Sequence, residues 1–162
     1  MEIFILRHGV AEDAQAGQPD SERALTPEGR KKLKNVLRAA AAAGVTPTLI
    51  LSSPYKRALQ TAQMAAEILD YKGEVLRTKA LEPGSSPKTV WDEIRVHKDE
   101  ERILLAGHEP LFGRLTAHLL GSPNLQVDFK KGAMVCIELD RFPAEPHGVL
   151  RWMLTSKLVA AQ

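Results

Sequence analysis

The sequence predicts an α/β protein, built as a three-layer α/β/α sandwich around a mostly parallel sheet. Short runs of aliphatic and β-branched residues alternate with longer segments whose apolar residues recur at helical spacing. This alternation continues from one end to the other, and no repeat or linker interrupts it. The 162 residues suffice to bury a core without disulfides, so we expect one domain over residues 1–162.

The expected strands are short apolar runs, each bounded by polar or turn-forming residues. In chain order they are Glu2–Leu6, Thr48–Leu51, Glu74–Arg77, Arg102–Ala106, Met134–Leu139 and Val149–Leu154. The third is expected at a sheet edge. A segment with two prolines and a glycine, 141–148, is expected to be a turn or loop between the last two strands. The sheet is expected to be mostly parallel, with one antiparallel edge.

The helix signals lie between these strands. Thr26 and Pro27 are typical of a helix start, and Gly44 is typical of a helix end. Further helices are expected after Pro54, over Pro87–His97, and after Pro110.

Composition excludes several classes of function. The net charge is only +2, which argues against nucleic acid as the main partner. No apolar run approaches the roughly 20 residues of a membrane span, and no signal peptide is visible, so a cytoplasmic location without membrane contact is expected. The single cysteine, Cys136, lies in an apolar stretch and is interpreted as a buried small side chain, not a nucleophile.

Phosphate-suited side chains follow three of the expected strands. The first strand leads into Arg7 and His8, the second leads toward Arg57, and the fourth leads into His108. Parallel strands bring their carboxyl ends to one edge of the sheet, and the helix starts that follow favour anions. Two arginines and two histidines at such an edge form a site suited to a phosphoryl group.

The motifs at these positions resemble the histidine phosphatase superfamily in order and approximate spacing. They are Arg7-His8-Gly9, the stretch from Ser52-Ser53-Pro54 to Arg57-Ala58-Leu59-Gln60-Thr61-Ala62, and Gly107-His108-Glu109-Pro110. The short chain lacks room for the segments that roof the site in larger members. It therefore resembles the compact branch, the SixA-type phosphohistidine phosphatases, which implies a phosphoglycerate-mutase-like fold.

The resemblance implies roles for the four shared residues. His8 is expected to attack phosphorus with a neutral ring nitrogen, while a backbone carbonyl holds the other nitrogen. Arg7 and Arg57 are expected to bind the phosphoryl oxygens, and a protonated His108 would add a third positive contact. Gly9 is expected beside the phosphate.

Two further residues are weighed against ordinary surface roles. The stretch Arg23-Ala24-Leu25-Thr26 resembles the segment where this branch places an auxiliary active-site arginine, so Arg23 is either a phosphate-binding residue or a solvated loop arginine. SixA-type members have a glutamate where this chain has Ala80, and Glu82 lies two residues further on. Glu82 is either a catalytic general acid or a solvated loop charge, and both interpretations stay open.

Two polar segments flank the expected pocket. The segment Val10–Glu22 is expected to be a mobile loop beside it. Lys130 and Lys131 are interpreted as a solvated charge pair, not as phosphate ligands.

The expected function is a metal-independent phosphatase that acts through a covalent phosphohistidine. The preferred substrate is phosphohistidine on a protein, because a site without a roof admits a side chain of a folded partner. A small-molecule phosphomonoesterase is the alternative, and a non-catalytic phosphate-binding module is a third. No metal and no cofactor are expected, since no Cys/His cluster has zinc spacing and the arginines supply the positive charge.

Overall fold

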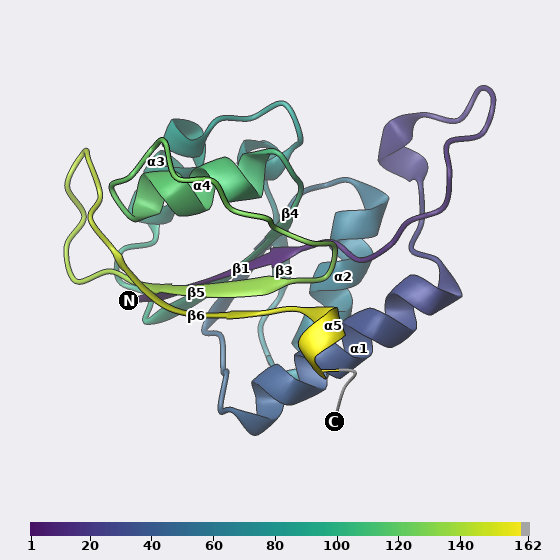
Figure 1. Ribbon diagram of the computed structural model, residues 1–162, viewed down its shortest axis with the longest axis horizontal. Coiled ribbons are helices and arrows are strands. Elements are labelled where there is room, and N and C mark those ends of the chain that lie inside the picture. The colour runs from purple at the N-terminus through teal and green to yellow at the C-terminus, as the bar shows by residue number, and fades with distance from the viewer. Residues whose placement is uncertain (160–162) are drawn as a thin grey trace.

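The computed structural model describes residues 1–159 and shows a six-stranded sheet with helices on both faces (Figure 1). The strand order across the sheet is β3-β2-β4-β1-β5-β6. In chain order the strands are β1 (Glu2–Arg7), β2 (Leu49–Ser52), β3 (Val75–Arg77), β4 (Arg102–Gly107), β5 (Met134–Glu138) and β6 (Val149–Leu154). The α/β sandwich expected from the sequence is confirmed.

Helices cover both faces of this sheet. They are α1 (Pro27–Ala42), α2 (Lys56–Ile68), α3 (Pro87–Val96), α4 (Leu111–Leu119) and the short α5 (Ser156–Val159), with 3₁₀ turns η1 (Asp20–Glu22) and η2 (Lys79–Leu81). Helices α3 and α4 pack on one face, and α1, α2 and α5 pack on the other. Both faces of the central strands are therefore removed from water.

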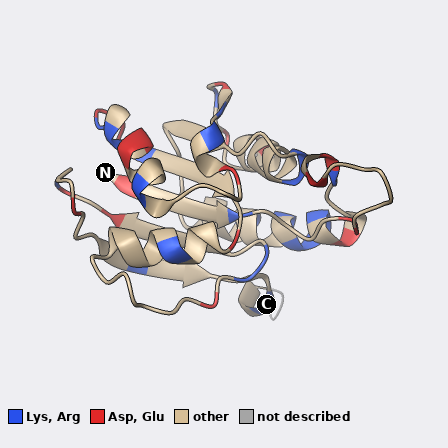
Figure 2. Cartoon of the chain, turned by 90° about the horizontal axis from the view of Figure 1, so that it is seen from above, with Lys and Arg blue, Asp and Glu red and all other residues tan. Residues whose placement is uncertain are grey.

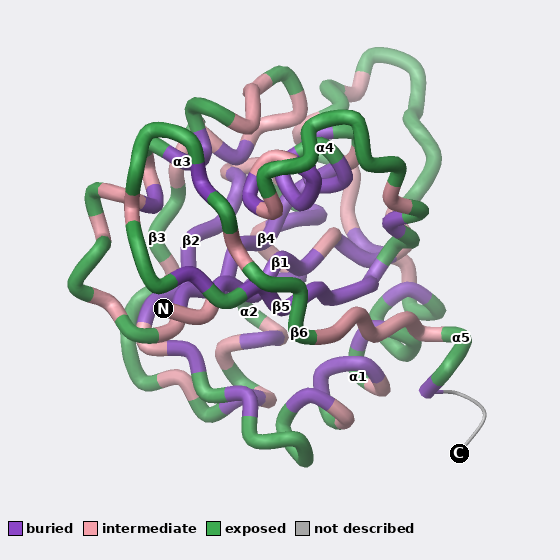
Figure 3. The backbone as a smooth tube through the Cα atoms, turned by 60° about the vertical axis from the view of Figure 1, so that its left-hand side comes forward, coloured by how far each residue is buried: buried purple, intermediate pink, exposed green. Residues whose placement is uncertain are grey.

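Each face of the sheet has its own apolar core, because alternate residues of a strand point to opposite faces. Ile3 and Ile5 pack with the residues of α3 and α4, including the fully buried Trp91. Phe4 and Leu6 pack with the residues of α1 and α2. Figure 3 shows the central strands β1, β2, β4 and β5 as the buried centre of the molecule, surrounded by exposed loops.

The start of α1 is held close to the loop that follows β1. The Thr26 hydroxyl caps the helix by accepting the Gly29 N–H at 2.9 Å, and the Thr26 N–H donates to Val10 O. A Cβ at position 29 would lie 2.3 Å from that same carbonyl oxygen, so only glycine fits there. This contact holds the start of α1 against the loop that follows β1.

Two features differ from the sequence-based expectation. The antiparallel strand, β5, lies inside the sheet and pairs with β1, whereas β6 forms the edge. The apolar side chains of β5 are buried on both faces of the sheet, whereas those of β6 are partly exposed. This difference in burial is why β5 is the inner strand of the two. The short helix α5, which the sequence pattern did not indicate, packs on α1. In the described residues, no helix is long and apolar enough to cross a membrane.

Candidate active site

The site lies where β1, β2 and β4 end side by side. Arg7 is in register with Gly107, and Ser52 is in register with Ala106. The pairing continues one residue past each strand, since the His8 N–H donates to Gly107 O and the Ser53 N–H donates to Ala106 O, both at 2.9 Å. This pairing brings His8 and His108 together, with ring centroids 5.2 Å apart.

The tautomer of His8 is set by two contacts. Its Nδ1 lies 2.7 Å from the carbonyl oxygen of Gly9, which can only accept, so Nδ1 carries the proton. Its Nε2 accepts a hydrogen bond from Arg57 Nε at 3.3 Å and therefore carries the lone pair. A backbone carbonyl thus orients the ring, as the resemblance implies, and leaves Nε2 as the nucleophilic nitrogen.

His8 is neutral near pH 7. Burial lowers the pKa of its imidazole to about 4, and the charges of Arg57, Arg7 and Lys131 act in the same direction, against the opposing effect of the Gly9 carbonyl. The residue is only 7% exposed. A neutral imidazole with a defined lone pair is the form that attacks phosphorus.

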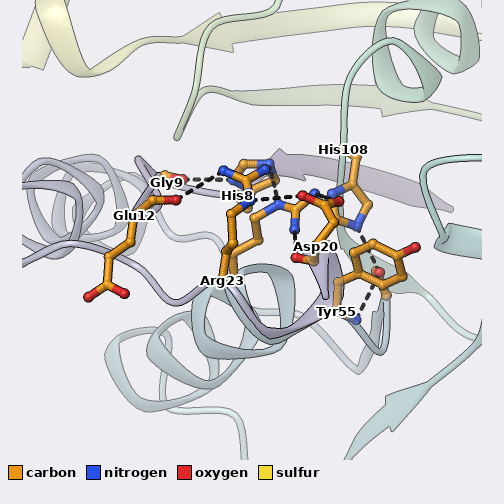
Figure 4. A network of polar contacts seen from close by, with 9 residues as sticks. His8, Gly9, Glu12, Asp20, Arg23, Tyr55 and His108 are labelled. Carbon is orange, nitrogen blue, oxygen red and sulfur yellow. Dashed lines mark hydrogen bonds and ion pairs between the residues drawn. The ribbon is translucent and has the colours of Figure 1, made fainter. Parts of the chain in front are cut away.

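Arg57 reaches this nitrogen from the first turn of α2. The side chain is buried, and its guanidinium also donates to Asp20, from Nη1 to the backbone oxygen at 2.8 Å and from Nη2 to Oδ2 at 3.0 Å. Figure 4 shows Asp20 beside His8 and His108 in this network. The guanidinium therefore lies between the nucleophile and a carboxylate.

Asp20 also binds Arg23. The Arg23 Nε lies 2.8 Å from Asp20 Oδ1, and its Nη1 donates to Glu12 O at 3.0 Å. Partial burial raises the pKa of Asp20, but hydrogen bonds from Arg23 and Arg57 outweigh this and hold the pKa below its ordinary value. Arg23 therefore belongs to the cluster, and Asp20 links it to Arg57. The only sequence sign of Asp20 is its position three residues before Arg23.

His108 is buried beside Ser53 and Tyr55. Its Nε2 lies 2.8 Å from the Ser53 hydroxyl, which also accepts the Tyr55 N–H at 3.2 Å, and the Tyr55 ring packs edge-on against it. The Ser53 hydroxyl has two acceptor lone pairs and one hydrogen, so beside the Tyr55 N–H it pairs with Nε2 in either tautomer of the imidazole. Within the described residues the other ring nitrogen, Nδ1, is buried without a partner.

Burial lowers the pKa of His108 to about 3, and the neighbouring His8 and Arg57 lower it further, so the ring is neutral. The third positive contact expected from the sequence is therefore a neutral hydrogen-bonding group in this state. A buried ring nitrogen without a partner is unfavourable, and an arriving phosphoryl oxygen would satisfy Nδ1 when it carries the imidazole proton.

Arg7 completes the positive side of the site. Its Nη1 donates to Phe129 O at 2.7 Å, which anchors the guanidinium, while its Nε is buried without a partner in the part of the chain described. Burial lowers the pKa of Arg7, and the nearby carboxylates of Glu109 and Asp128 oppose that effect. An arginine stays charged under such conditions, so Arg7 presents an anchored charge beside His8.

Gly9 positions the nucleophile with its backbone. Its carbonyl oxygen accepts a hydrogen bond from the Nδ1–H of His8, and its N–H donates to the Thr61 hydroxyl at 3.3 Å. The same hydroxyl donates to Arg57 O at 2.8 Å. Both backbone groups of Gly9 are thus engaged within the protein, and Thr61, to which the sequence motif gave no role, ties the turn after β1 to α2.

The structure does not place Glu82 in this cluster. It follows η2 and lines a neighbouring cavity of about 520 Å³ together with Tyr55 and the η1 turn. Its carboxylate has no hydrogen bond or ion pair to another described residue. Tyr55, which packs on His108, lies on the boundary between this cavity and the cluster.

Cys136 lies outside the cluster, and the described residues offer no metal centre. Cys136 is fully buried in β5, and burial raises the pKa of its thiol to about 12, so it is not a nucleophile at neutral pH. Over residues 1–159, no group of three His, Cys, Asp or Glu side chains is arranged to hold a metal ion.

Comparison with known proteins assigns the family. The model of the histidine phosphatase superfamily (branch 1) matches residues 3–82. A phosphohistidine phosphatase SixA homolog of Haemophilus influenzae is 32% identical over 137 residues, which cover 76% of this chain and 80% of that protein. An uncharacterized protein of Picosynechococcus sp. is 29% identical over 137 residues, which cover 83% of each.

Solved structures agree with this assignment. The structure of the protein histidine phosphatase SixA complexed with tungstate matches with a TM-score of 0.87 and 25% identity, over 98% of this chain and 99% of that one. The strand-end cluster, the sequence relatives and this likeness lead to the same answer. This chain belongs to the histidine phosphatase superfamily, as a SixA-like phosphatase with a phosphoglycerate-mutase-like fold.

Proposed function

We propose that the protein hydrolyses phosphohistidine on a partner protein, through a covalent intermediate on His8 and without a metal. The observation that carries this proposal is the state of His8. Its imidazole is neutral, and Nε2, which bears the lone pair, lies among Arg57, Arg7 and His108. The N–H at Nδ1 donates to a backbone carbonyl.

In the first step the Nε2 lone pair forms a bond to phosphorus, and the bond from phosphorus to the leaving group breaks. The Arg57 Nε–H, which donates to Nε2 at 3.3 Å, then turns to a phosphoryl oxygen. The buried Arg7 Nε, without a partner in the described chain, is a second donor, and the similarly unpartnered His108 Nδ1 is a third in the tautomer that carries its proton there. Such preorganised donors stabilise the charge that spreads over the equatorial oxygens.

In the second step water attacks phosphorus and the bond to Nε2 breaks, which returns His8 and releases phosphate. The phosphorylated ring carries more positive charge than the neutral one. The hydrogen bond from Nδ1 to Gly9 O, already 2.7 Å long, stabilises that charge in both steps.

Substrate class follows from the leaving group. An alkoxide leaving group needs an acid, and none of the described side chains in the cluster is a protonated acid: Asp20 is ionised and both histidines are neutral. A phosphorylated imidazole departs more easily. The SixA relatives, which are described as phosphohistidine phosphatases, support the same choice.

A small-molecule phosphomonoesterase is the second candidate, and one observation favours it. Glu82 lines a cavity that shares Tyr55 with the cluster, so a bound leaving group that filled this cavity would meet a carboxyl group. The two functions differ in whether Glu82 takes part.

Turnover by one preparation tests the proposal. The kcat/KM values for a phosphohistidine peptide and for nitrophenyl phosphate should be far higher than the value for a sugar phosphate, because the sugar alkoxide is a much more basic leaving group. Equal turnover of the sugar phosphate would contradict the proposal and favour the second candidate.

Glu82→Gln separates the two directly. Under the proposed function this change leaves kcat for all three substrates within about twofold. If Glu82 is a general acid, kcat for the sugar phosphate falls about a hundredfold, while the phosphohistidine peptide is least affected. Glu22→Gln, which changes another carboxylate on the same cavity, is the matched control.

A further inference from the structure

A second cavity adjoins Arg7 and Gly9. Its volume is about 780 Å³, and it lies between α1, the loop that precedes β5, and the segment containing α5. Arg7 and Gly9 line it, so its rim adjoins the residues that position the nucleophile. The apolar side chains of Met153 and Leu158 form part of its accessible wall, above the buried Leu33.

The cavity is strongly basic, although the whole chain carries a charge of only +2. Besides Arg7, its lining includes Lys32, Lys130, Lys131 and Lys157, and Asp128 is the one acidic residue among the described lining residues. Asp128 is paired with Lys130 at 3.2 Å. Figure 2 shows the basic stretch of loop next to the C-terminal helix.

Three of these lysines remain uncompensated. In the described part of the chain, no carboxylate forms an ion pair with Lys32, Lys131 or Lys157. Lys131 precedes Gly132, whose N–H donates to the backbone oxygens of His8 at 3.0 Å and Arg7 at 3.1 Å, so the basic loop is attached to the nucleophile segment. Lys130 and Lys131 are exposed, in line with their interpretation as solvated charges, and they also line this cavity.

We propose that this cavity binds an acidic segment of the partner protein, next to the phosphohistidine that enters the active site. This proposal rests on the proposed function. Lysine ammonium groups suit carboxylates held at loosely defined angles, and an apolar wall suits the aliphatic stems of glutamate. A free inorganic anion would use the lysines but not the wall.

Binding of a labelled peptide tests the cavity without turnover. The probe is a fluorescent peptide rich in glutamate, with a glutamine version as reference, and the full chain is titrated by fluorescence anisotropy. Lys32→Gln with Lys157→Gln should weaken binding of the glutamate peptide about tenfold, because two exposed charge contacts are lost.

Lys34→Gln with Lys98→Gln removes the same charge elsewhere on the surface, and this control should bind like the wild type. Equal weakening by both double variants would show a diffuse field instead of a site and overturn the proposal. Binding of an oligonucleotide as tight as that of the glutamate peptide would overturn it as well.

Activity links the cavity to the substrate. The wild type should prefer a phosphohistidine peptide flanked by glutamates over one flanked by glutamines, and the Lys32/Lys157 variant should lose this preference while its kcat/KM for nitrophenyl phosphate stays unchanged. Equal wild-type turnover of both peptides overturns the docking site alone. Turnover of nitrophenyl phosphate but of neither peptide overturns the proposed function, and the anisotropy titration then still decides whether acidic chains bind.

Discussion

The chemistry of His8 depends on its surroundings more than on its residue type. An exposed histidine is partly protonated near neutral pH, whereas burial and two arginines keep this one neutral. The Gly9 carbonyl and the Arg57 Nε–H then decide which nitrogen holds the proton. The positions of His8, Arg7 and His108 are predictable from sequence, because each lies at or just past the end of a strand.

The contact between Asp20 and Arg57 is not predictable in this way. Asp20 lies in the short η1 turn of a polar segment without apolar periodicity, and only the tertiary fold brings it within 3.0 Å of a guanidinium 37 positions away. The neutral state of His108 is hidden for the same reason, since burial, not sequence position, sets its pKa. The sequence pattern does not show such contacts, because they join residues that are far apart in the chain.

Arg57→Lys should lower kcat/KM by about a hundredfold or more. Lysine keeps the charge but cannot present a planar fork of donors to the phosphoryl oxygens. Steady-state kinetics with nitrophenyl phosphate measures the loss. Arg38→Lys, an exposed change on α1, should match the wild type, and an Arg57→Lys enzyme with wild-type kinetics would contradict the role of the fork.

At the scale of elements, the site depends on how the turn after β1 is fastened to α1 and α2. Gly29 allows the start of α1 to approach Val10 O, and Thr61 on α2 bonds both Gly9 and Arg57. The helix start at Pro27 is evident in the sequence. The role of Thr61 is not, because a threonine within a helix gives no sign of which loop it contacts.

Thr61→Val should reduce both stability and activity. The substitution leaves the buried Gly9 N–H without its acceptor, so we expect the free energy of unfolding to fall by about 1–3 kcal/mol and kcat to fall as the turn loosens. Urea unfolding and steady-state kinetics measure the two effects. Thr116→Val is the control, since its buried hydroxyl donates only to Phe112 O within α4; an equal loss of kcat there would show that Thr61 acts through stability alone.

At the scale of the whole molecule, two strands illustrate the limits of prediction. The alternation of strands and helices predicts the sandwich correctly, because each amphipathic element must bury one face against another layer. The sequence indicates where β5 and β6 lie but not which one is central. That choice depends on which strand both layers of helices cover, and this is a property of the complete fold.

Two buried neutral histidines should make stability depend on pH. His8 and His108 take up protons near pH 6.5 when unfolded but only near 4 and 3 when folded, so the unfolded state binds more protons between these values. The free energy of unfolding should therefore fall as pH drops below about 6.5, by up to about 1.4 kcal/mol per pH unit for each histidine.

Urea unfolding of wild type and His108→Asn at several values between pH 7 and pH 4.5 measures this effect. In His108→Asn, the slope of the free energy of unfolding against pH should decrease by up to about 1.4 kcal/mol per pH unit, because one titrating group is removed. His97→Asn, at the end of α3, should keep the wild-type slope. A His108→Asn curve parallel to that of the wild type would contradict the neutral burial of His108.

Trapping the intermediate is the most direct test of His8 as the covalent nucleophile. The enzyme is mixed with radiolabelled nitrophenyl phosphate in excess chelator, quenched within milliseconds, and digested for mapping. Label that is acid-labile, base-stable and confined to the peptide containing His8 is the expected result, with none in His8→Asn. Turnover that leaves no label on His8, or full activity of His8→Asn, would contradict the mechanism.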